Sequence, residues 1–300
     1  VLDGNSSFVQ IVRIRREGNV NRITRLDNQR IRKLWSDPLL RYSNVLDGLF
    51  HEAVVVTESD SDARFYAAVS DALFEARSSA VRKPDVMFIH GGGKARLPMI
   101  VRSLRELGVP VKAAADFDIL NAESPLAELV DAAGGKWDEL KGDWMAVKKS
   151  VDSKKPDLSS EVVKKSISEI LTGVTTPNFQ LESKSVINKV LRKSSPWAHA
   201  KSIGKAFVPS GDSTQTCNRL LAKLREIGIF VVEVGELEGF FREVGSHGPS
   251  WVNEVLKRNL LMEPKLEDAR TFVKALVGEV PPTSVAVQPT IGIDASAPHV

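Results

Sequence analysis

Three short apolar runs constrain the fold of this chain more than any other feature of its sequence. The runs Ala53–Thr57, Val86–His90 and Val111–Ala115 each end at glycine or acidic residues, and segments of helical length and period separate them. A strand–helix–strand–helix–strand order builds a parallel sheet with right-handed crossovers, in which the carboxyl ends of the strands meet at one edge. We therefore predict an α/β fold with helices on the faces of a parallel sheet.

Carboxylates follow two of these runs directly. Glu58 follows the first run, Asp62 stands four positions later in the first turn of a helix predicted from Asp60, its N-cap, to residue 76, and Asp116 and Asp118 follow the third run. Because ligands bind at the carboxyl edge of open parallel sheets, we expect these acids to lie in a small volume. A fourth apolar run, over residues 229–234, also leads into glycine and acids, Glu236 and Glu238.

Carboxylates crowded into one place need a cation. Oxygen ligands without a His or Cys cluster favour a hard cation such as Mg²⁺ or Mn²⁺ over zinc. Two such cations could activate a water and stabilise the leaving oxygen of a phosphodiester. The alternative is that the acids are helix caps and exposed loop charges. Four acids at the ends of two strands of one sheet favour the metal site. His90, His199 and His247 are assigned no role, and the last two are placed in loops.

A glycine-rich turn could bind a phosphate. Gly91, Gly92 and Gly93 precede Lys94, at the start of a helix predicted over residues 95–107. Helix N-termini favour phosphate, but a tight strand-to-helix turn explains the glycines equally well. The turn lacks the spacing and the Ser or Thr of a Walker loop, so the sequence shows no ATP site.

Lysines supply the basic side chains that phosphoryl chemistry needs. Lys201 and Lys205 lead back into the α/β core, and either could stabilise charge on a scissile phosphate. Lysines are also frequent over residues 141–165, where they could follow a nucleic-acid backbone. A solvated lysine surface is the alternative in both cases.

The pattern divides the chain into segments. Helical periodicity without strands follows residue 120, and the α/β pattern resumes later with a helix over residues 214–227. We predict a lead-in over residues 1–50, a first part of the core over 51–123, a helical insertion over 124–200, a second part of the core over 201–243, closing helices over 244–280 and a disordered tail over 281–300. In the lead-in, residues 8–14 form a strand, residues 21–28 are its hairpin partner or a loop, and a helix begins at Asp27.

Composition places the chain in a broad class. The formal net charge of +3 is only mildly basic, and the single cysteine, Cys217, fits a reducing cytosol. The sequence shows neither a signal peptide nor an apolar run of membrane-spanning length. We therefore predict a cytoplasmic protein without a membrane partner. Because the chain starts at Val1 rather than Met, in the middle of what reads as a strand, we expect a fragment of a longer protein.

These motifs together resemble a known family. Glu58 with Asp62, a glycine-bearing second strand end and Asp116-Phe-Asp118 resemble the Toprim domain of topoisomerases, primases and related nucleases. Ser59 stands where many Toprim sequences have Gly. Most of residues 40–260 is similar to the C-terminal half of class 2 OLD-family (overcoming lysogenization defect) nucleases, through the wording of residues 50–66, 115–120, 234–238 and 247–251.

The resemblance implies a fold and an activity. It implies a Rossmann-like Toprim sheet interrupted by an inserted all-helical domain, and a two-metal DNA endonuclease of bacterial, phage-defence type. Family members carry an N-terminal ABC-type ATPase domain, which would be a partner of this segment in a full-length protein that could be homodimeric. The resemblance implies that Glu58, Asp62, Asp116 and Asp118 are metal ligands, to which Glu236 or Glu238 contributes. It also implies a lysine that contacts the phosphate, for which Lys201 is preferred to Lys205.

Other functions fit the same residues. A Toprim module without catalysis would bind nucleic acid or regulate a partner, but would not cut. A topoisomerase needs a nucleophilic tyrosine, and this chain has only Tyr42 and Tyr66, the second in an apolar helix stripe. A primase would need a template-handling domain that the sequence does not show. The nuclease is therefore the preferred hypothesis.

Overall fold

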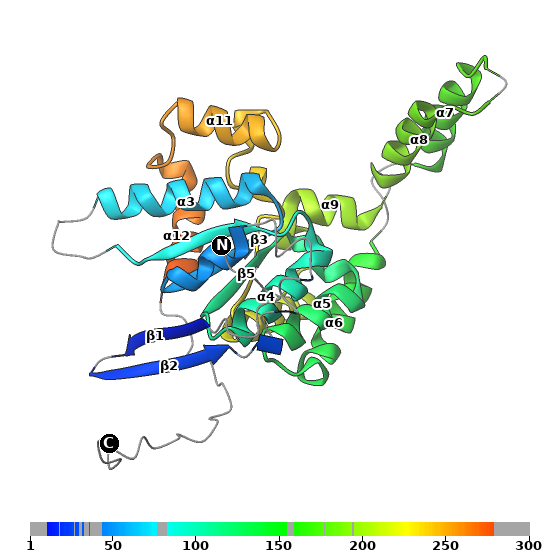
Figure 1. Cartoon of the computed structure of the whole chain (residues 1–300). Coiled ribbons are helices and arrows are strands. Elements are labelled where there is room, and N and C mark those ends of the chain that lie inside the picture. Colours follow the sequence, from blue (N-terminus) through cyan, green and yellow to red (C-terminus); the bar gives the residue numbers. More distant parts are fainter. Residues whose placement is uncertain are drawn as a thin grey trace, which may run out of the picture.

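A four-stranded parallel sheet forms the centre of the molecule (Figure 1). The computed structural model describes residues 11–17, 19–26, 28–29, 32, 36, 44–76, 83–154, 159–176, 178–193 and 195–278. The strands are β3 (Ala53–Thr57), β4 (Val86–His90), β5 (Val111–Ala115) and β6 (Ile229–Val231), in the order β4-β3-β5-β6. All three strand pairs are parallel. The predicted α/β fold with a parallel sheet is confirmed, and its architecture is compatible with a Rossmann-like fold.

Helices cover both faces of this sheet, because alternate residues of each strand point to opposite sides. Val54 and Val56 belong to one apolar core, whereas Val55 belongs to the other. The first core contains α4 (Leu97–Glu106), α5 (Glu123–Ala132), α6 (Trp137–Asp152) and α10 (Asp212–Glu226). The second contains α3 (Asp60–Glu75), α11 (Pro249–Lys257) and α12 (Glu267–Val277). The strands β3, β5 and β6 are therefore buried on both sides, as their continuous apolar runs predict, whereas the edge strand β4 is half-buried.

Lys112 is a charged residue inside this sheet. It lies in β5 and is 3% exposed, and its Nζ donates to the Ala275 and Gly278 carbonyl oxygens at 3.1 and 2.9 Å. A lysine at the end of a helix satisfies carbonyl groups that have no partner within the helix. Lys112 thus caps the C-terminus of α12, and burial lowers its pKa to about 8.

Six α-helices of the described chain, α5 to α10, lie between β5 and β6. Of these, α5 and α6 pack in the first core, whereas α7 (Ser160–Thr172) and α8 (Leu181–Lys193) form an arm that projects from the body (Figure 1). No residue of α7 is buried. The chain returns through α9 (Pro196–Ile203), which packs against α6.

The N-terminal part of the described chain is a separate hairpin. β1 (Ile11–Glu17) pairs antiparallel with β2 (Val20–Leu26), so the hairpin alternative for the second segment is the one that the structure adopts. Arg13 joins the hairpin to the body through the carbonyl oxygens of Leu49, His51 and Gly108, which surround its guanidinium. The 3₁₀ helix η1 (Asn44–Phe50) leads from this region into β3.

Several predicted element boundaries need correction. Ser59, not Asp60, is the N-cap of α3, since its hydroxyl accepts the Asp62 N–H. The fourth run forms a strand of only three residues, because the chain turns where the Gly235 N–H donates to the Val232 carbonyl. The segment that contains His199 is the helix α9 and not a loop. Most of the helix predicted from Asp27, and the tail 281–300, lie outside the described residues.

Candidate metal centre

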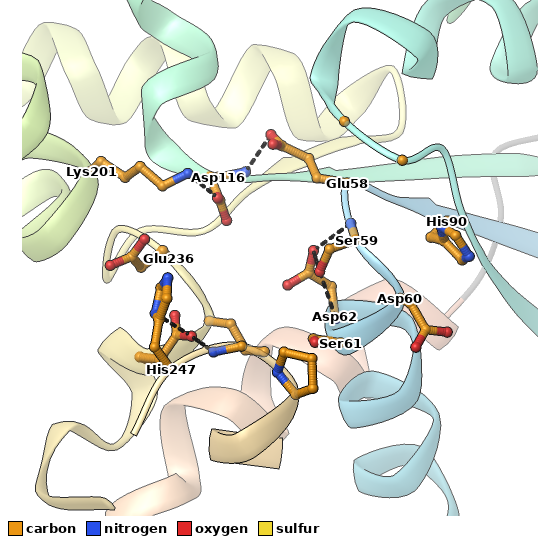
Figure 2. A pocket seen from close by; sticks show the side chains of 16 residues that line it. Glu58, Ser59, Asp60, Ser61, Asp62, His90, Asp116, Lys201, Glu236 and His247 are labelled. Atoms are coloured by element: carbon orange, nitrogen blue, oxygen red, sulfur yellow. Dashed lines mark hydrogen bonds and ion pairs between the residues drawn. The ribbon is translucent and has the colours of Figure 1, made fainter. Parts of the chain in front are cut away.

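A cleft of about 580 Å³ opens at the carboxyl edge of the sheet (Figure 2). It lies where β3, β4, β5 and β6 end, which is the edge that parallel topology predicts for a ligand site. The residues that line it come from six places along the chain: Glu58, Ser59, Asp60, Ser61, Asp62, His90, Gly92, Gly93, Asp116, Lys201, Glu236, Leu237, Glu238, His247, Gly248 and Pro249.

Three carboxylates converge in this region. Glu58, Asp116 and Asp118 each offer an oxygen, and the three oxygens lie within 4.8 Å of one another. Glu58 follows β3, and its Oε1 accepts the Asp116 backbone N–H at 3.1 Å. Asp116 and Asp118 stand at the start of the 3₁₀ helix η3 (Phe117–Asn121), directly after β5. The adjacency of β3 and β5 therefore brings together acids that are far apart in the sequence.

Lys201 reaches the same carboxylates from α9. Its Nζ lies 2.8 Å from Asp116 Oδ2 and 3.9 Å from Asp118 Oδ1. Lys205 points elsewhere: its Nζ pairs with Glu233 Oε2 at 2.5 Å, and it does not line the cleft. The two lysines separate because α9 ends at Ile203.

Gly204, the next residue, has a φ of +65°, and a Cβ there would lie 2.0 Å from the Glu233 carbonyl oxygen. Only glycine permits this close approach of two backbones. The end of α9, with Lys201, is consequently fixed against the loop that follows β6.

The glycine-rich turn contributes a second lysine. Lys94 Nζ donates to Asp118 Oδ2 at 2.8 Å, and the Gly93 N–H donates to the Glu58 carbonyl oxygen at 2.8 Å. Gly92 and Gly93 line the cleft and have φ angles of +70° and +125°, which side chains other than hydrogen rarely permit. The predicted phosphate contacts of Gly92, Gly93 and Lys94 remain a prediction.

Asp62 lies on the opposite side of the cleft from Lys201 (Figure 2). Its Oδ2 accepts the Ser59 N–H at 2.8 Å and the Ser59 hydroxyl at 2.9 Å. These contacts complete a capping box at the start of α3. One oxygen of this buried carboxylate is thus engaged in helix capping, and the other remains available to the cleft.

A second group of potential ligands forms beyond β6. Glu236, Glu238 and His247 each offer an atom, and these atoms also lie within 4.8 Å of one another. His247 Nδ1 lies 2.6 Å from Glu238 Oε1, which also accepts the Gly248 N–H at 2.5 Å. The sequence predicts Glu236 and Glu238 here, but not His247. The loop before α11 brings His247 to these acids, and no spacing in the sequence distinguishes it from an ordinary loop histidine.

Burial and neighbouring charges shift pKa values in the first carboxylate group. Burial, and then the charges of Asp116 and Asp118, raise the pKa of Glu58 to about 8. Burial raises the pKa of Asp116, while the nearby Lys201 acts in the opposite direction. Burial lowers the pKa of Lys201, but Asp116, Asp118 and Glu58 outweigh it and raise that pKa above its ordinary value. The lysine is therefore charged at neutral pH.

Asp62 and Glu236 show the same effect. Burial, and then the charge of Asp116, raise the pKa of Asp62 to about 6. Burial and the charge of Glu238 raise the pKa of Glu236. A cation placed among these side chains would favour their charged forms and so oppose both the burial and the repulsion that raise the pKa values.

One atom tests directly whether the residues fit a metal ion. Asp118 Oδ1 is buried and accepts no hydrogen bond. A buried acceptor without a hydrogen bond is rare in folded proteins, and an ion that binds to it is one explanation. The donors of the first group are all carboxylate oxygens, which suits a hard divalent cation. These acids could therefore hold a metal ion.

The comparisons with known proteins add no identification. The chain matches no protein-family model, no curated protein and no solved structure. Within the described residues, no helix is long and apolar enough to cross a membrane. The fold and the cleft define an α/β protein with a candidate metal centre at the carboxyl edge of its sheet.

Proposed function

We propose that this chain is a metal-dependent DNA endonuclease of the Toprim type. The observation that carries the proposal is the convergence of Glu58, Asp116 and Asp118 with Lys201 at the carboxyl edge of a parallel sheet. Phosphoryl transfer needs positioning and charge neutralisation more than covalent chemistry, and carboxylates with a fixed ammonium group can provide both.

Each group has a role in this proposal. Glu58, Asp116 and Asp118 would hold one Mg²⁺ or Mn²⁺. Asp62, with Glu236 and Glu238, would hold a second. Bound cations would supply an activated water and stabilise the leaving oxygen.

Lys201 does not depend on the cations for its placement. Gly204 fixes the end of its helix, and the ammonium lies at the cleft, where it can contact a phosphate oxygen. Lys205 would stabilise the fold through its ion pair with Glu233 and would take no part in the reaction.

The resemblance of the motifs extends the proposal. The chain would be the catalytic half of a class 2 OLD-family nuclease, with α5–α9 as its inserted helical domain. DNA would be the substrate, and an N-terminal ABC-type ATPase domain of the full-length bacterial protein would be its partner, in the cytoplasm. Strand passage is disfavoured, because Tyr66 is 1% exposed and burial raises its pKa well above the ordinary value. Tyr42 lies outside the described residues.

One observation favours a second candidate, a Toprim module that binds nucleic acid without cutting it. Asp116 and Asp118 already pair with Lys201 and Lys94, so part of the acidic charge is neutralised by the protein itself. A site that is stable without a cation would not need one to fold. This module predicts weak cation binding and retention of uncut DNA.

Plasmid cleavage separates the two candidates. Supercoiled plasmid would be incubated with Mg²⁺, Mn²⁺, Ca²⁺ or EDTA and with wild type, Asp116→Ala or the control Asp131→Ala, whose exposed carboxylate pairs with Arg102. We expect nicked and linear DNA with Mg²⁺ or Mn²⁺ for wild type and the control, and none for Asp116→Ala. The circular dichroism spectrum of Asp116→Ala should match that of wild type. Uncut DNA that is still retarded on a gel would favour the binding module.

A further inference from the structure

The turn from Gly91 to Lys94 connects two parts of the candidate metal centre. The Gly91 N–H donates to the Thr57 carbonyl oxygen at 2.9 Å, and the Gly93 N–H donates to that of Glu58 at 2.8 Å. Lys94 Nζ then donates to Asp118 Oδ2 at 2.8 Å and to the Asp118 carbonyl oxygen at 3.3 Å. The turn is therefore attached to the end of β3 on one side and to the Asp118 segment on the other.

These contacts do not suit a phosphate cradle. Such a cradle needs backbone N–H groups directed at the ligand and a lysine free to reach it. Here two N–H groups of the turn bind the neighbouring strand end, and the half-buried ammonium of Lys94 binds Asp118. The positive φ angles of Gly92 and Gly93 serve to return the chain so that Lys94 faces Asp118.

We propose that Lys94 is a positioning residue of the metal centre, an inference that rests on the proposed function. Lys94 holds Asp118 by Oδ2. The other oxygen, Oδ1, is buried without a hydrogen bond and lies 3.9 Å from Lys201 Nζ, on the side of Asp116. The pair thus fixes which oxygen of Asp118 is presented to a cation. Partners behind a metal ligand commonly set its orientation in this way.

This role has two opposite consequences. The charge of Lys94 competes with a cation for the electrons of Asp118, so its removal strengthens cation binding. The same removal frees the Asp118 carboxylate to rotate, so the bound cation is less well placed and the reaction slows. If Lys94 instead bound a DNA phosphate, its replacement would weaken DNA binding and leave cation binding unchanged.

The test compares Lys94→Met and Lys94→Arg with the control Lys83→Met. Lys83 pairs with Asp71 on the surface, and both side chains are more than half exposed. It precedes β4 and so lies at the edge of the sheet opposite the cleft. Mn²⁺ binding is measured by titration calorimetry, DNA affinity by gel retardation with Ca²⁺, and the nicking rate with saturating Mn²⁺ and DNA.

For Lys94→Met we expect Mn²⁺ to bind at least threefold more tightly, nicking to slow at least tenfold and DNA affinity to stay within twofold. Lys94→Arg should recover part of the nicking rate, and Lys83→Met should match wild type in all three measurements. Weaker DNA binding with unchanged Mn²⁺ affinity would overturn the positioning role in favour of a phosphate ligand. No change in any measurement would overturn it in favour of a solvated ion pair.

The outcomes also separate this inference from the proposed function. Wild type that cuts DNA alongside an unaltered Lys94→Met variant contradicts the role of Lys94 alone. Tighter Mn²⁺ binding by Lys94→Met in a protein that never cuts DNA supports the role of Lys94 and contradicts the nuclease. Wild type that binds no Mn²⁺ overturns both.

Discussion

Glu58 makes the stability of the cation-free protein depend on pH. Burial and the charges of Asp116 and Asp118 raise its pKa from 4.5 to about 8. An acid with a raised pKa stabilises the folded state fully below the pKa of the unfolded state, and this stabilisation is lost as the pH rises through the folded-state pKa. The window for Glu58 therefore extends from about pH 4.5 to pH 8. Replacement by Gln removes the titration and keeps an oxygen that can accept the Asp116 N–H.

The expected magnitude follows from these two pKa values. One pH unit within the window corresponds to about 1.4 kcal/mol. Between pH 5 and pH 8, wild type should lose about 3 to 4 kcal/mol more of its free energy of unfolding than Glu58→Gln does. Asp62 and the other acids titrate in both proteins, so the difference between the two isolates Glu58 and the groups coupled to it.

Urea unfolding in EDTA at pH 5, 6, 7 and 8 measures this difference. The five tryptophans of the chain supply the fluorescence signal, and linear extrapolation gives the free energy of unfolding. The control is Glu106→Gln, an exposed acid at the end of α4, which should follow wild type at every pH. Parallel loss of stability by wild type and Glu58→Gln, or a Glu58→Gln variant less stable than wild type at pH 8, would refute the reasoning.

Three further predictions concern the two lysines, the close backbone contact at Gly204 and the bound cation. Lys201→Met should slow nicking at least a hundredfold, whereas Lys205→Met should cut normally and lose about 1 kcal/mol of stability in urea, since it leaves Glu233 with one partner less. Gly204→Ala should lose about 3 kcal/mol or more, because its Cβ would meet the Glu233 carbonyl oxygen; normal stability in urea would contradict the close approach. Mg²⁺ at a hundred times its dissociation constant should stabilise wild type by about 2.7 kcal/mol. Thermal unfolding should show no such gain for Asp118→Asn.

The sequence predicts both the sheet and the proximity of the acids, because both follow from the geometry of buried parallel strands. All five residues of β3 are buried, and a strand buried on both faces reads as a continuous apolar run. Parallel strands direct their carboxyl ends to one edge, so Glu58 and Asp116 could be placed together without knowledge of any side-chain conformation.

Local choices between neighbouring residues could not be predicted in the same way. Ser59 and Asp60 are both good N-cap residues, and the contacts of Asp62 decide in favour of Ser59. Lys201 and Lys205 stand four apart, a spacing that places both on one face of a continuous helix. The helix stops at Ile203 instead, and Lys205 turns to Glu233.

Contacts between residues of different loops could not be predicted from the sequence. His247 reaches Glu238 only after the chain has turned at Gly245, which has a positive φ. No period or spacing records this path. The pairing of Lys94 with Asp118 is similar, since the two residues share no element and meet only once β4 and β5 have taken their places beside β3.

The position of Lys112 has a consequence for biosynthesis. Its strand, β5, gains its outer neighbour β6 only after residues 116–228 have been made, which takes roughly 5 to 20 s at ribosomal rates. During that interval β5 is an open edge, and a lysine on an open edge discourages pairing with other chains. A truncated chain that ends at residue 228 should therefore aggregate faster, by light scattering, when it carries Lys112→Val. We therefore expect that the residue that caps α12 in the folded protein first protects the nascent sheet from intermolecular pairing.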